Sequence, residues 1–238
     1  MTLFYDSLEK LALEAGLPIS EPALEKLDAF YMLMEEANRS FNLTSIEGPS
    51  ESALRHFMDS LAFPALNRLY PGEYIIDVGT GAGFPGMPVA IVREQLHVTL
   101  LDSMKKRTAF LESAVKSLGL TNVTVVTARA EDYARGERRE QYDAAISRAV
   151  APLNVLMEYM LPLIKPGGRA LSWKGPSAEE EVSASINACR VLGGAQPVLH
   201  GYSLPGRPSF YIVEVEKKKL TPSSFPRKAG KPSINPIT

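Results

Sequence analysis

The sequence has few residues of the kinds that carry redox or metal chemistry. Cys189 is the only cysteine among 238 residues, so an internal disulfide is excluded. The three histidines, His56, His97 and His200, are scattered rather than set at metal-ligand spacing. We therefore expect no metal site. Apolar residues precede Cys189 at helical spacing, which predicts a core thiol rather than a nucleophile.

Long apolar runs are also absent. Charged residues interrupt the N-terminal region too early for a secretory signal, and no uninterrupted apolar run is long enough to span a membrane. A composition of 45% hydrophobic and 22% charged residues is that of an ordinary globular protein. We expect a cytoplasmic protein with no membrane partner. Without a sustained heptad repeat, we also expect a monomer.

The formal net charge of -1 conceals an asymmetry. Six basic residues and no acidic residue follow Glu216, so the rest of the chain carries -7. This tail favours an anionic partner, although a basic surface that is merely solvated fits the charge equally well. Four prolines after Leu220 exclude a continuous helix or a central strand, and we expect an extended or disordered arm.

The segment from Tyr74 to Gly86, YIIDVGTGAGFPG, joins an apolar strand to a glycine-dense turn through Asp77. Glycines permit positive φ and close approach of a ligand to the backbone, and prolines after them suit the first turn of a helix. The pattern also matches the G-x-G-x-x-G fingerprint of dinucleotide-binding folds. A P-loop is excluded because no Gly-Lys-Ser/Thr closes the turn. A nucleotide-like cofactor and a tight turn without a ligand both remain open here.

The rest of the chain predicts an α/β fold. Helical patterns come first, and strand-like and helix-like segments then alternate, which is typical of an open sheet. The last two strands flank a Pro-Gly-Arg-Pro turn and must be antiparallel. We predict helices at 3–14, 21–38 and about 50–63, and strands at 74–78, 97–101, 123–128, 144–147, 169–173, 198–204 and 210–216.

Polar residues follow the second and third predicted strands. Asp102 comes 23 positions after Gly79, where a carboxylate would meet the hydroxyls of a ribose bound over the glycine turn. It would also suit the cap of the following helix. Ala130 and Glu131 follow the third strand beside the same crevice, where they could hold an adenine, although acid-rich loops are also common as solvated surface.

These features together resemble a class I S-adenosylmethionine-dependent methyltransferase. Within that class the chain resembles the glucose-inhibited division protein B family, the bacterial 16S ribosomal RNA guanine-N7 methyltransferases. The motifs that carry this resemblance are Asn42-Leu43-Thr44-Ser45-Ile46, His56-Phe57 with Asp59-Ser60, Gly79 through Gly86, Leu101-Asp102-Ser103 with Lys106-Arg107, Ser147-Arg148-Ala149-Val150-Ala151, and Phe225-Pro226-Arg227-Lys228 with Gly230 and Pro232.

The resemblance implies a Rossmann-like sheet of about seven strands with an antiparallel C-terminal hairpin. It divides the chain into an N-terminal helical cap (1–66), a methyltransferase domain (67–219) and a basic, proline-rich tail (220–238). It also implies that S-adenosylmethionine contacts Gly79, Phe84, Ala130, Glu131 and Arg148, to which the physical arguments add Gly81 and Asp102. The implied substrate is a guanine in the 530 loop of 16S ribosomal RNA, alone or in the small ribosomal subunit.

The mechanism is narrowed by missing motifs. Exocyclic amine methylation usually needs Asn or Asp before Pro-Pro-aromatic after the fourth strand, where this chain has Ser147-Arg148-Ala149-Val150. Pyrimidine carbon methylation needs a cysteine nucleophile, and Cys189 is far from any such position. Guanine N7 needs neither, so we assign no catalytic residue. Glu131 and Asp143 are weak candidates for stabilising the developing positive charge.

Phosphate contacts are expected from Arg227, Lys228 and Lys231 in the tail.

Two other functions are compatible with the glycine turn. A non-catalytic RNA-binding protein of ribosome assembly would keep the same fold without methyl transfer. A nicotinamide-dependent oxidoreductase is disfavoured by the terminal hairpin and by Lys165-Pro166-Gly167-Gly168 before a strand.

Overall fold

The computed structural model describes residues 2–40, 43–46 and 48–238, so Asn42 of the first motif lies outside the described residues. The first two helices, α1 (Leu3–Glu14) and α2 (Glu21–Asn38), have the predicted bounds. The Thr2 side chain caps α1 by accepting a 3.1 Å hydrogen bond from the Tyr5 N–H, and Pro22 lies in the first turn of α2. Their apolar faces pack together, as Phe4 and Tyr31 show with ring centroids 4.2 Å apart.

The third predicted helix is confirmed as helical but not as a regular α-helix. It consists of α3 (Pro49–Ser52) and the π-helical segment η1 (Ala53–Met58), and the short helix α4 (Phe63–Leu66) follows. The wider turns of a π-helix change the direction of its side chains and are frequent at functional sites. Here η1 places His56 against the main body of the fold.

The sheet has seven strands in the order β3-β2-β1-β4-β5-β7-β6. Strands β1 to β5 are parallel, and β7 pairs antiparallel with both β5 and β6, so the predicted α/β sheet with a terminal antiparallel hairpin is confirmed. The strands are β1 (Tyr74–Val78), β2 (His97–Asp102), β3 (Val123–Thr127), β4 (Tyr142–Arg148), β5 (Ile164–Lys174), β6 (Val198–Leu204) and β7 (Arg207–Glu216).

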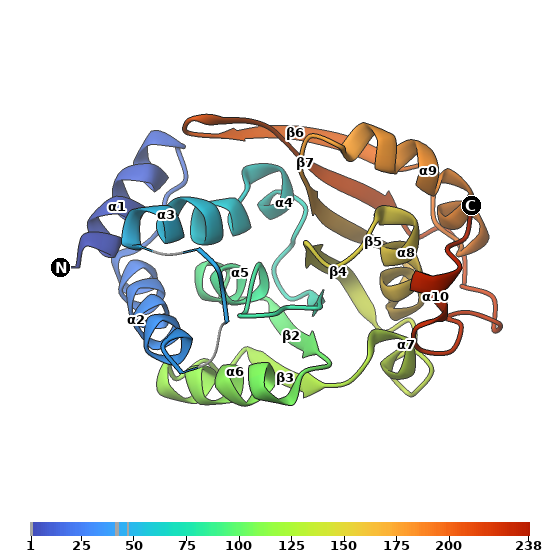
Figure 1. Ribbon diagram of the computed structural model, residues 1–238, viewed down its shortest axis with the longest axis horizontal. Coiled ribbons are helices and arrows are strands. Elements are labelled where there is room, and N and C mark those ends of the chain that lie inside the picture. Colours follow the sequence, from blue (N-terminus) through green and yellow to red (C-terminus); the bar gives the residue numbers. More distant parts are fainter. Residues whose placement is uncertain (1, 41–42, 47) are drawn as a thin grey trace.

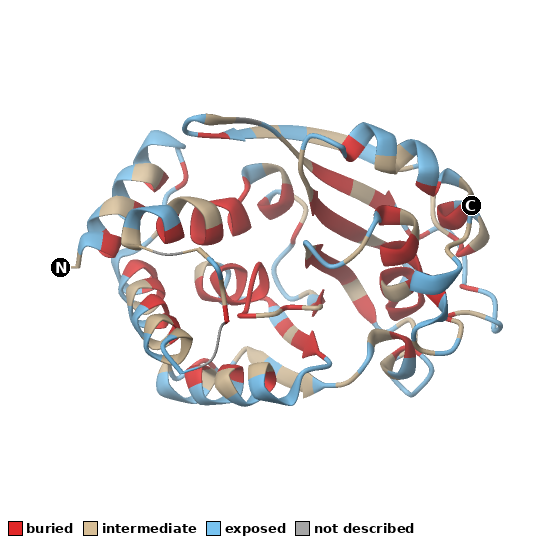
Figure 2. Cartoon of the chain, in the orientation of Figure 1, coloured by how far each residue is buried: buried red, intermediate tan, exposed pale blue. Residues whose placement is uncertain are grey.

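Helices cover both faces of the sheet, and each face has its own apolar core (Figures 1 and 2). The N-terminal helices share a core with α5 (Gly86–Val92) and α6 (Lys105–Ser117), while α8 (Leu153–Met160) and α9 (Ala178–Val191) cover the other face. The short elements are α7 (Ala130–Tyr133), η2 (Leu161–Leu163) and α10 (Lys231–Ile234).

Cys189 is fully buried, as predicted for a core thiol, and burial raises its pKa to about 11.

The prediction of an extended or disordered tail is wrong. The segment after Leu220 folds back along α7 and α8, and its carbonyl groups accept hydrogen bonds from arginines of the main domain. Arg139 donates to the carbonyl oxygens of Thr221 and Phe225 at 2.6 and 2.7 Å. Prolines lack the N–H needed for a strand ladder. The backbone carbonyl groups of the tail therefore accept hydrogen bonds from the guanidinium groups instead. Sequence composition cannot reveal such long-range partners.

Candidate active site

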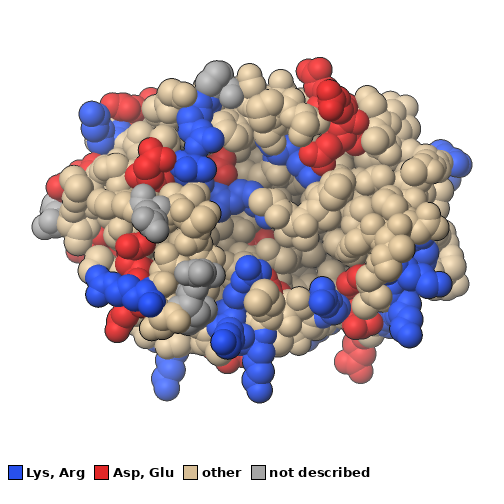
Figure 3. Space-filling view, viewed as in Figure 1, with Lys and Arg blue, Asp and Glu red and all other residues tan. Residues whose placement is uncertain are grey.

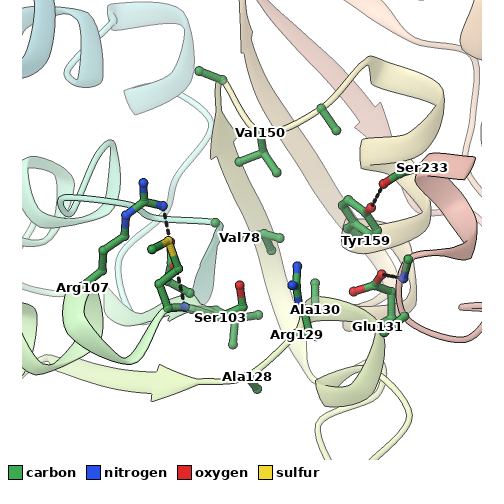
Figure 4. A pocket seen from close by; sticks show the side chains of 18 residues that line it. Val78, Ser103, Arg107, Ala128, Arg129, Ala130, Glu131, Val150, Tyr159 and Ser233 are labelled. Carbon is green, nitrogen blue, oxygen red and sulfur yellow. Dashed lines mark hydrogen bonds and ion pairs between the residues drawn. The ribbon is translucent and has the colours of Figure 1, made fainter. Parts of the chain in front are cut away.

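A cavity of about 540 Å³ opens at the carboxyl ends of β1, β2 and β4. This is the edge where open α/β sheets bind ligands, and the volume is in the range of small-molecule sites. Figure 4 shows Ser103, Ala128, Ala130 and Glu131 on one side and Val150 on the other. Of the predicted cofactor residues, Gly79, Asp102, Ala130 and Glu131 line this cavity.

The buried side chain of Asp77 holds the glycine turn through hydrogen bonds. Its Oδ2 accepts hydrogen bonds from the Thr80 hydroxyl at 2.7 Å and from the Gly86 N–H at 2.8 Å, so one carboxyl group ties together both ends of the turn. Its Oδ1 is buried and has no hydrogen-bond partner among the described residues. Burial raises the pKa of Asp77 to about 7 despite these hydrogen bonds. The turn is therefore held by a carboxyl group whose charge is costly to bury.

The backbone of the turn comes close to the opposite wall of the cavity. Gly79 has φ +72°, and a Cβ atom built there would lie 2.5 Å from Cγ2 of Val150. No side chain fits at that distance, so the position requires glycine for space as well as for conformation. Close packing of Gly79 against Val150 sets the width of the cavity at this end.

The side chain of Asp102 binds two backbone N–H groups beside the cavity. Its Oδ1 accepts a 2.8 Å hydrogen bond from the Met104 N–H just before α6, and its Oδ2 accepts a 3.0 Å hydrogen bond from the Gly81 N–H. The described lining does not include Gly81 itself. Gly81 is linked to the cavity by its hydrogen bond to Asp102, which does line it. Arg107 lies 3.5 Å from the same Oδ2 and also lines the cavity.

The C-terminal tail supplies part of the wall, which the sequence did not predict. Ala229, Gly230 and Ser233 line the cavity, and the Gly230 N–H donates a 2.9 Å hydrogen bond to Oε1 of Glu131. The hydroxyl groups of Tyr159 and Ser233 are 2.7 Å apart, as Figure 4 shows. The only signal in the sequence was the presence of Gly230 among the family motifs, which gave no indication of where it would lie.

Phe84 and Arg148 lie beside the cavity rather than in its described lining. Phe84 is buried and stacks on His56 with ring centroids 4.5 Å apart, and the Arg148 guanidinium lies 5.3 Å from the Phe84 ring. Arg148 also donates hydrogen bonds to Oδ2 of Asp59 at 2.6 Å and to Nδ1 of His56 at 3.1 Å. Burial, with Arg148 beside it, lowers the pKa of His56 to about 3, so its ring is neutral and accepts at Nδ1.

A second cavity of about 460 Å³ adjoins the first. The two share Ala149, Val150 and Ala151, the residues that follow β4. Arg148 and Asp59 line the second cavity together with the aromatic residues Trp173, Tyr202 and Phe210. A group bound in one cavity would therefore lie beside a group bound in the other, with residues 149–151 bordering both.

The remaining predicted residues are dispersed. Asp143 lies at the opposite end of β4, paired with Lys165 and the Tyr74 N–H, so it cannot stabilise charge at this site, and that candidate was wrong. In the tail, Lys228 and Lys231 are exposed. Arg227 instead binds the buried carboxylate of Glu158, with Nη2 2.6 Å from Oε2.

The residues around the first cavity fit an adenosine cofactor. Asp102 and Glu131 bring carboxylate groups to the cavity, Glu131 follows the small residue Ala130, and the glycine turn leaves its backbone open to a ligand. No group of three or more potential metal-ligating side chains occurs in residues 2–40, 43–46 and 48–238, and no helix in that part is long and apolar enough to cross a membrane.

The sheet order, the antiparallel hairpin and this site define a class I S-adenosylmethionine-dependent methyltransferase. Residues 23–207 match the family model described as GidB, rRNA small subunit methyltransferase G. The chain belongs to that family.

Two relatives are similar in sequence to this chain over almost its whole length. Ribosomal RNA small subunit methyltransferase G of Desulforamulus reducens is 43% identical over 97% of this chain and 97% of its own length. The protein of the same name from Clostridium beijerinckii is 41% identical over 98% of this chain and 99% of its own. Among solved structures, the S-adenosylmethionine-dependent methyltransferase SibL in its apo form shares the fold at a TM-score of 0.56, with 15% identity over 91% of this chain and 74% of that chain.

Proposed function

We propose that the protein transfers a methyl group from S-adenosylmethionine to N7 of a guanine in the 530 loop of 16S ribosomal RNA. The observation that carries this proposal is the cavity at the carboxyl ends of the strands, lined by Asp102 and Glu131, in a chain of the rRNA small subunit methyltransferase G family. The target base itself follows from the family resemblance together with the missing amine and cysteine motifs.

The cofactor would lie between the glycine turn and the tail. Asp102 would bind the ribose hydroxyls, Ala130 and Glu131 would contact the adenine, and Gly79 would let the backbone approach the ligand; their positions in the cavity lining support these roles. Gly81 acts through its hydrogen bond to Asp102. Phe84 and Arg148 are proposed to support the site through their contact with each other and with the loop after β4.

The chemistry asks little of the protein beyond position. The cofactor supplies an electrophilic methyl group on a sulfonium, and guanine N7 has a lone pair that needs no general base. The work of this chain is to align the two, which lowers the entropic part of the barrier, and to exclude water. Two titratable groups near the cavity have structural roles. Asp77 holds the glycine turn in place, and Asp59 binds the guanidinium of Arg148.

The RNA would approach the face that Figure 3 shows, where Lys and Arg side chains border a central hollow. Lys228 and Lys231 are exposed on the tail segment that lines the cofactor cavity, and we propose them as phosphate contacts. Arg227 would hold that segment in place. A base in a single-stranded loop can be splayed out at low cost, which suits a cavity set below the surface. We expect the protein to act as a monomer in the cytoplasm.

The test offers methyl-labelled S-adenosylmethionine with naked 16S ribosomal RNA, isolated small subunits and, as a control, 23S ribosomal RNA. The proposal predicts label in the 16S RNA in at least one of the first two samples and none in the 23S RNA. The non-catalytic alternative predicts RNA binding without labelled RNA. Calorimetric titration with S-adenosylmethionine is a separate test, since the absence of cofactor binding would contradict the proposed methyl transfer.

A further inference from the structure

The second cavity has the features of a site for a planar, polar base. The side chains of Trp173, Tyr202 and Phe210 line it, with the Tyr202 and Phe210 ring centroids 5.7 Å apart. Aromatic side chains are the usual stacking partners of bases removed from a nucleic acid strand. The cavity shares the loop 149–151 with the cofactor cavity, so a base held there would lie next to the methyl donor.

Asp59 holds two of the three aromatic side chains, Trp173 and Tyr202, through hydrogen bonds. The backbone oxygen of Asp59 accepts a 2.7 Å hydrogen bond from Nε1 of Trp173, and its Oδ1 accepts a 2.6 Å hydrogen bond from the Tyr202 hydroxyl. Its Oδ2 is taken by Arg148 at 2.6 Å. Both carboxylate oxygens of Asp59 are thus already engaged in short hydrogen bonds, so this residue shapes the cavity and is not its free acceptor.

Glu181 provides the carboxylate that remains available. Its Oε2 accepts hydrogen bonds from Nζ of Lys174 at 2.6 Å and from the Leu153 N–H at 2.9 Å. Its Oε1 has only a 3.4 Å contact, with the Ser177 hydroxyl, among the described residues. The side chain is 23% exposed and lines the cavity, so Oε1 can accept a hydrogen bond from a ligand.

Guanine is the base that this acceptor selects. Its Watson–Crick edge presents two adjacent donors, the N1–H and the exocyclic amine, and the two lone pairs of Oε1 can accept from both. Cytosine and uracil do not present that pair, and adenine has an acceptor at N1. We infer that the cavity formed by Trp173, Tyr202, Phe210 and Glu181 is the subsite for the target guanine, with Glu181 reading its Watson–Crick edge. This inference rests on the proposed function and deepens it.

The experiment uses two synthetic stem-loops of the 530-loop sequence, one with guanine and one with inosine at the target position. Inosine lacks the exocyclic amine but keeps N7 and N1–H. Trp173 is the only tryptophan in the chain, so its fluorescence reports entry of a base into this cavity during titration of the full-length protein. The guanine stem-loop should change the emission and bind about tenfold more tightly than the inosine stem-loop.

Three variants locate the origin of that preference. Glu181→Ala should bring the two affinities within about twofold of each other, because the acceptor is gone. Glu180→Ala, a matched loss of charge at an exposed neighbouring position on α9, should keep the preference. Lys174→Met breaks the same ion pair as Glu181→Ala yet leaves the acceptor, so it should also keep the preference even if overall affinity falls.

Two results would overturn the subsite: unchanged Trp173 emission at saturation with the guanine stem-loop, or a guanine preference that survives in Glu181→Ala. Because both are measurements of binding, they are separate from methyl transfer. A wild-type protein that showed this binding pattern but left the RNA unmethylated would defeat the proposed function and not the subsite. A protein that methylated guanine N7 with equal affinity for both stem-loops would do the reverse.

Discussion

The N–H of Gly230 donates a 2.9 Å hydrogen bond to the side chain of Glu131 across 99 positions of sequence. Both residues line the cofactor cavity, so the tail forms part of its wall. The tail is anchored nearby through Arg227, whose guanidinium binds both oxygens of Glu158. A segment that looked like a free basic arm is therefore joined to the site where the methyl donor is proposed to bind.

Replacing Arg227 by Ala should loosen this wall. Glu158 is 1% exposed, and removing the guanidinium leaves its buried carboxylate with only the backbone N–H of residue 227 as a donor, which costs about 3 kcal/mol of unfolding free energy. We also expect weaker binding of S-adenosylmethionine, because the tail lines its cavity. Chemical denaturation and calorimetry measure the two effects. Lys228→Ala, at the exposed neighbouring position, should change neither, and equal effects in both variants would contradict the anchoring role of Arg227.

The double variant Lys228→Gln/Lys231→Gln should weaken RNA binding most at low salt. Each lost phosphate contact to a single strand lowers the slope of log affinity against log salt by about 0.7, so the slope should become roughly 1.4 smaller in magnitude. The control is Lys10→Gln/Lys116→Gln, which removes two exposed lysines from α1 and α6. A slope that is the same in the wild type and the tail variant would remove these lysines from the interface.

Gly79→Ala should abolish most cofactor binding, lowering affinity by at least about tenfold. The new Cβ atom would lie 2.5 Å from Val150, so the cavity wall must move. Gly119→Ala is the matched control, because Gly119 also has positive φ, at +62°, but a Cβ atom there has no neighbour within 4 Å. Both variants carry a backbone strain of about 1 kcal/mol. Thermal unfolding should therefore show a loss in both variants, larger in Gly79→Ala because of the added Val150 contact, while only Gly79→Ala affects calorimetric binding. Equal cofactor affinity in the two variants would show that the Val150 contact has no role.

Asp77 should make stability depend on pH in an unusual direction for an acid. Its pKa is raised by burial from 3.8 to about 7, so the folded state holds a proton that the unfolded state loses. Its contribution to stability is therefore fully present below pH 3.8 and is lost as pH rises through about 7.

Asp77→Asn removes this titration while keeping an acceptor for Thr80 and Gly86. Relative to wild type, the variant should gain on the order of 3 kcal/mol of unfolding free energy between pH 4 and pH 8. Urea denaturation at a series of pH values measures the difference. A constant gap between the two proteins over this range would mean that Asp77 is ionised throughout.

Local patterns predicted the secondary structure well because each element has its own signal. Helices α1 and α2 have apolar faces, α2 has Pro22 in its first turn, and the sheet strands are short apolar runs bounded by polar residues. The π-helical turns of η1 carry no such signal. They arise where His56 packs on Phe84, a contact between distant segments.

The site was predicted in part for the same reason. Asp102 is the last residue of β2 and Glu131 lies in the first turn of α7, just after β3, so topology alone placed them at the cavity. The tail wall, the pairing of Arg227 with Glu158 and the position of Arg148 beside Asp59 depend on contacts between residues far apart in the sequence. Nothing in the local sequence encodes which acid an arginine will meet.

The most direct test of the proposed function is to map the modified nucleotide. Small subunits methylated in vitro with isotope-labelled S-adenosylmethionine would be digested with a nuclease, and the fragments analysed by mass spectrometry. Reductive chain cleavage at N7-methylguanine would then mark the position in the RNA. We predict one labelled nucleotide, N7-methylguanine, within the 530 loop of 16S ribosomal RNA. Label on another atom, on another base or outside that loop would contradict the proposed function.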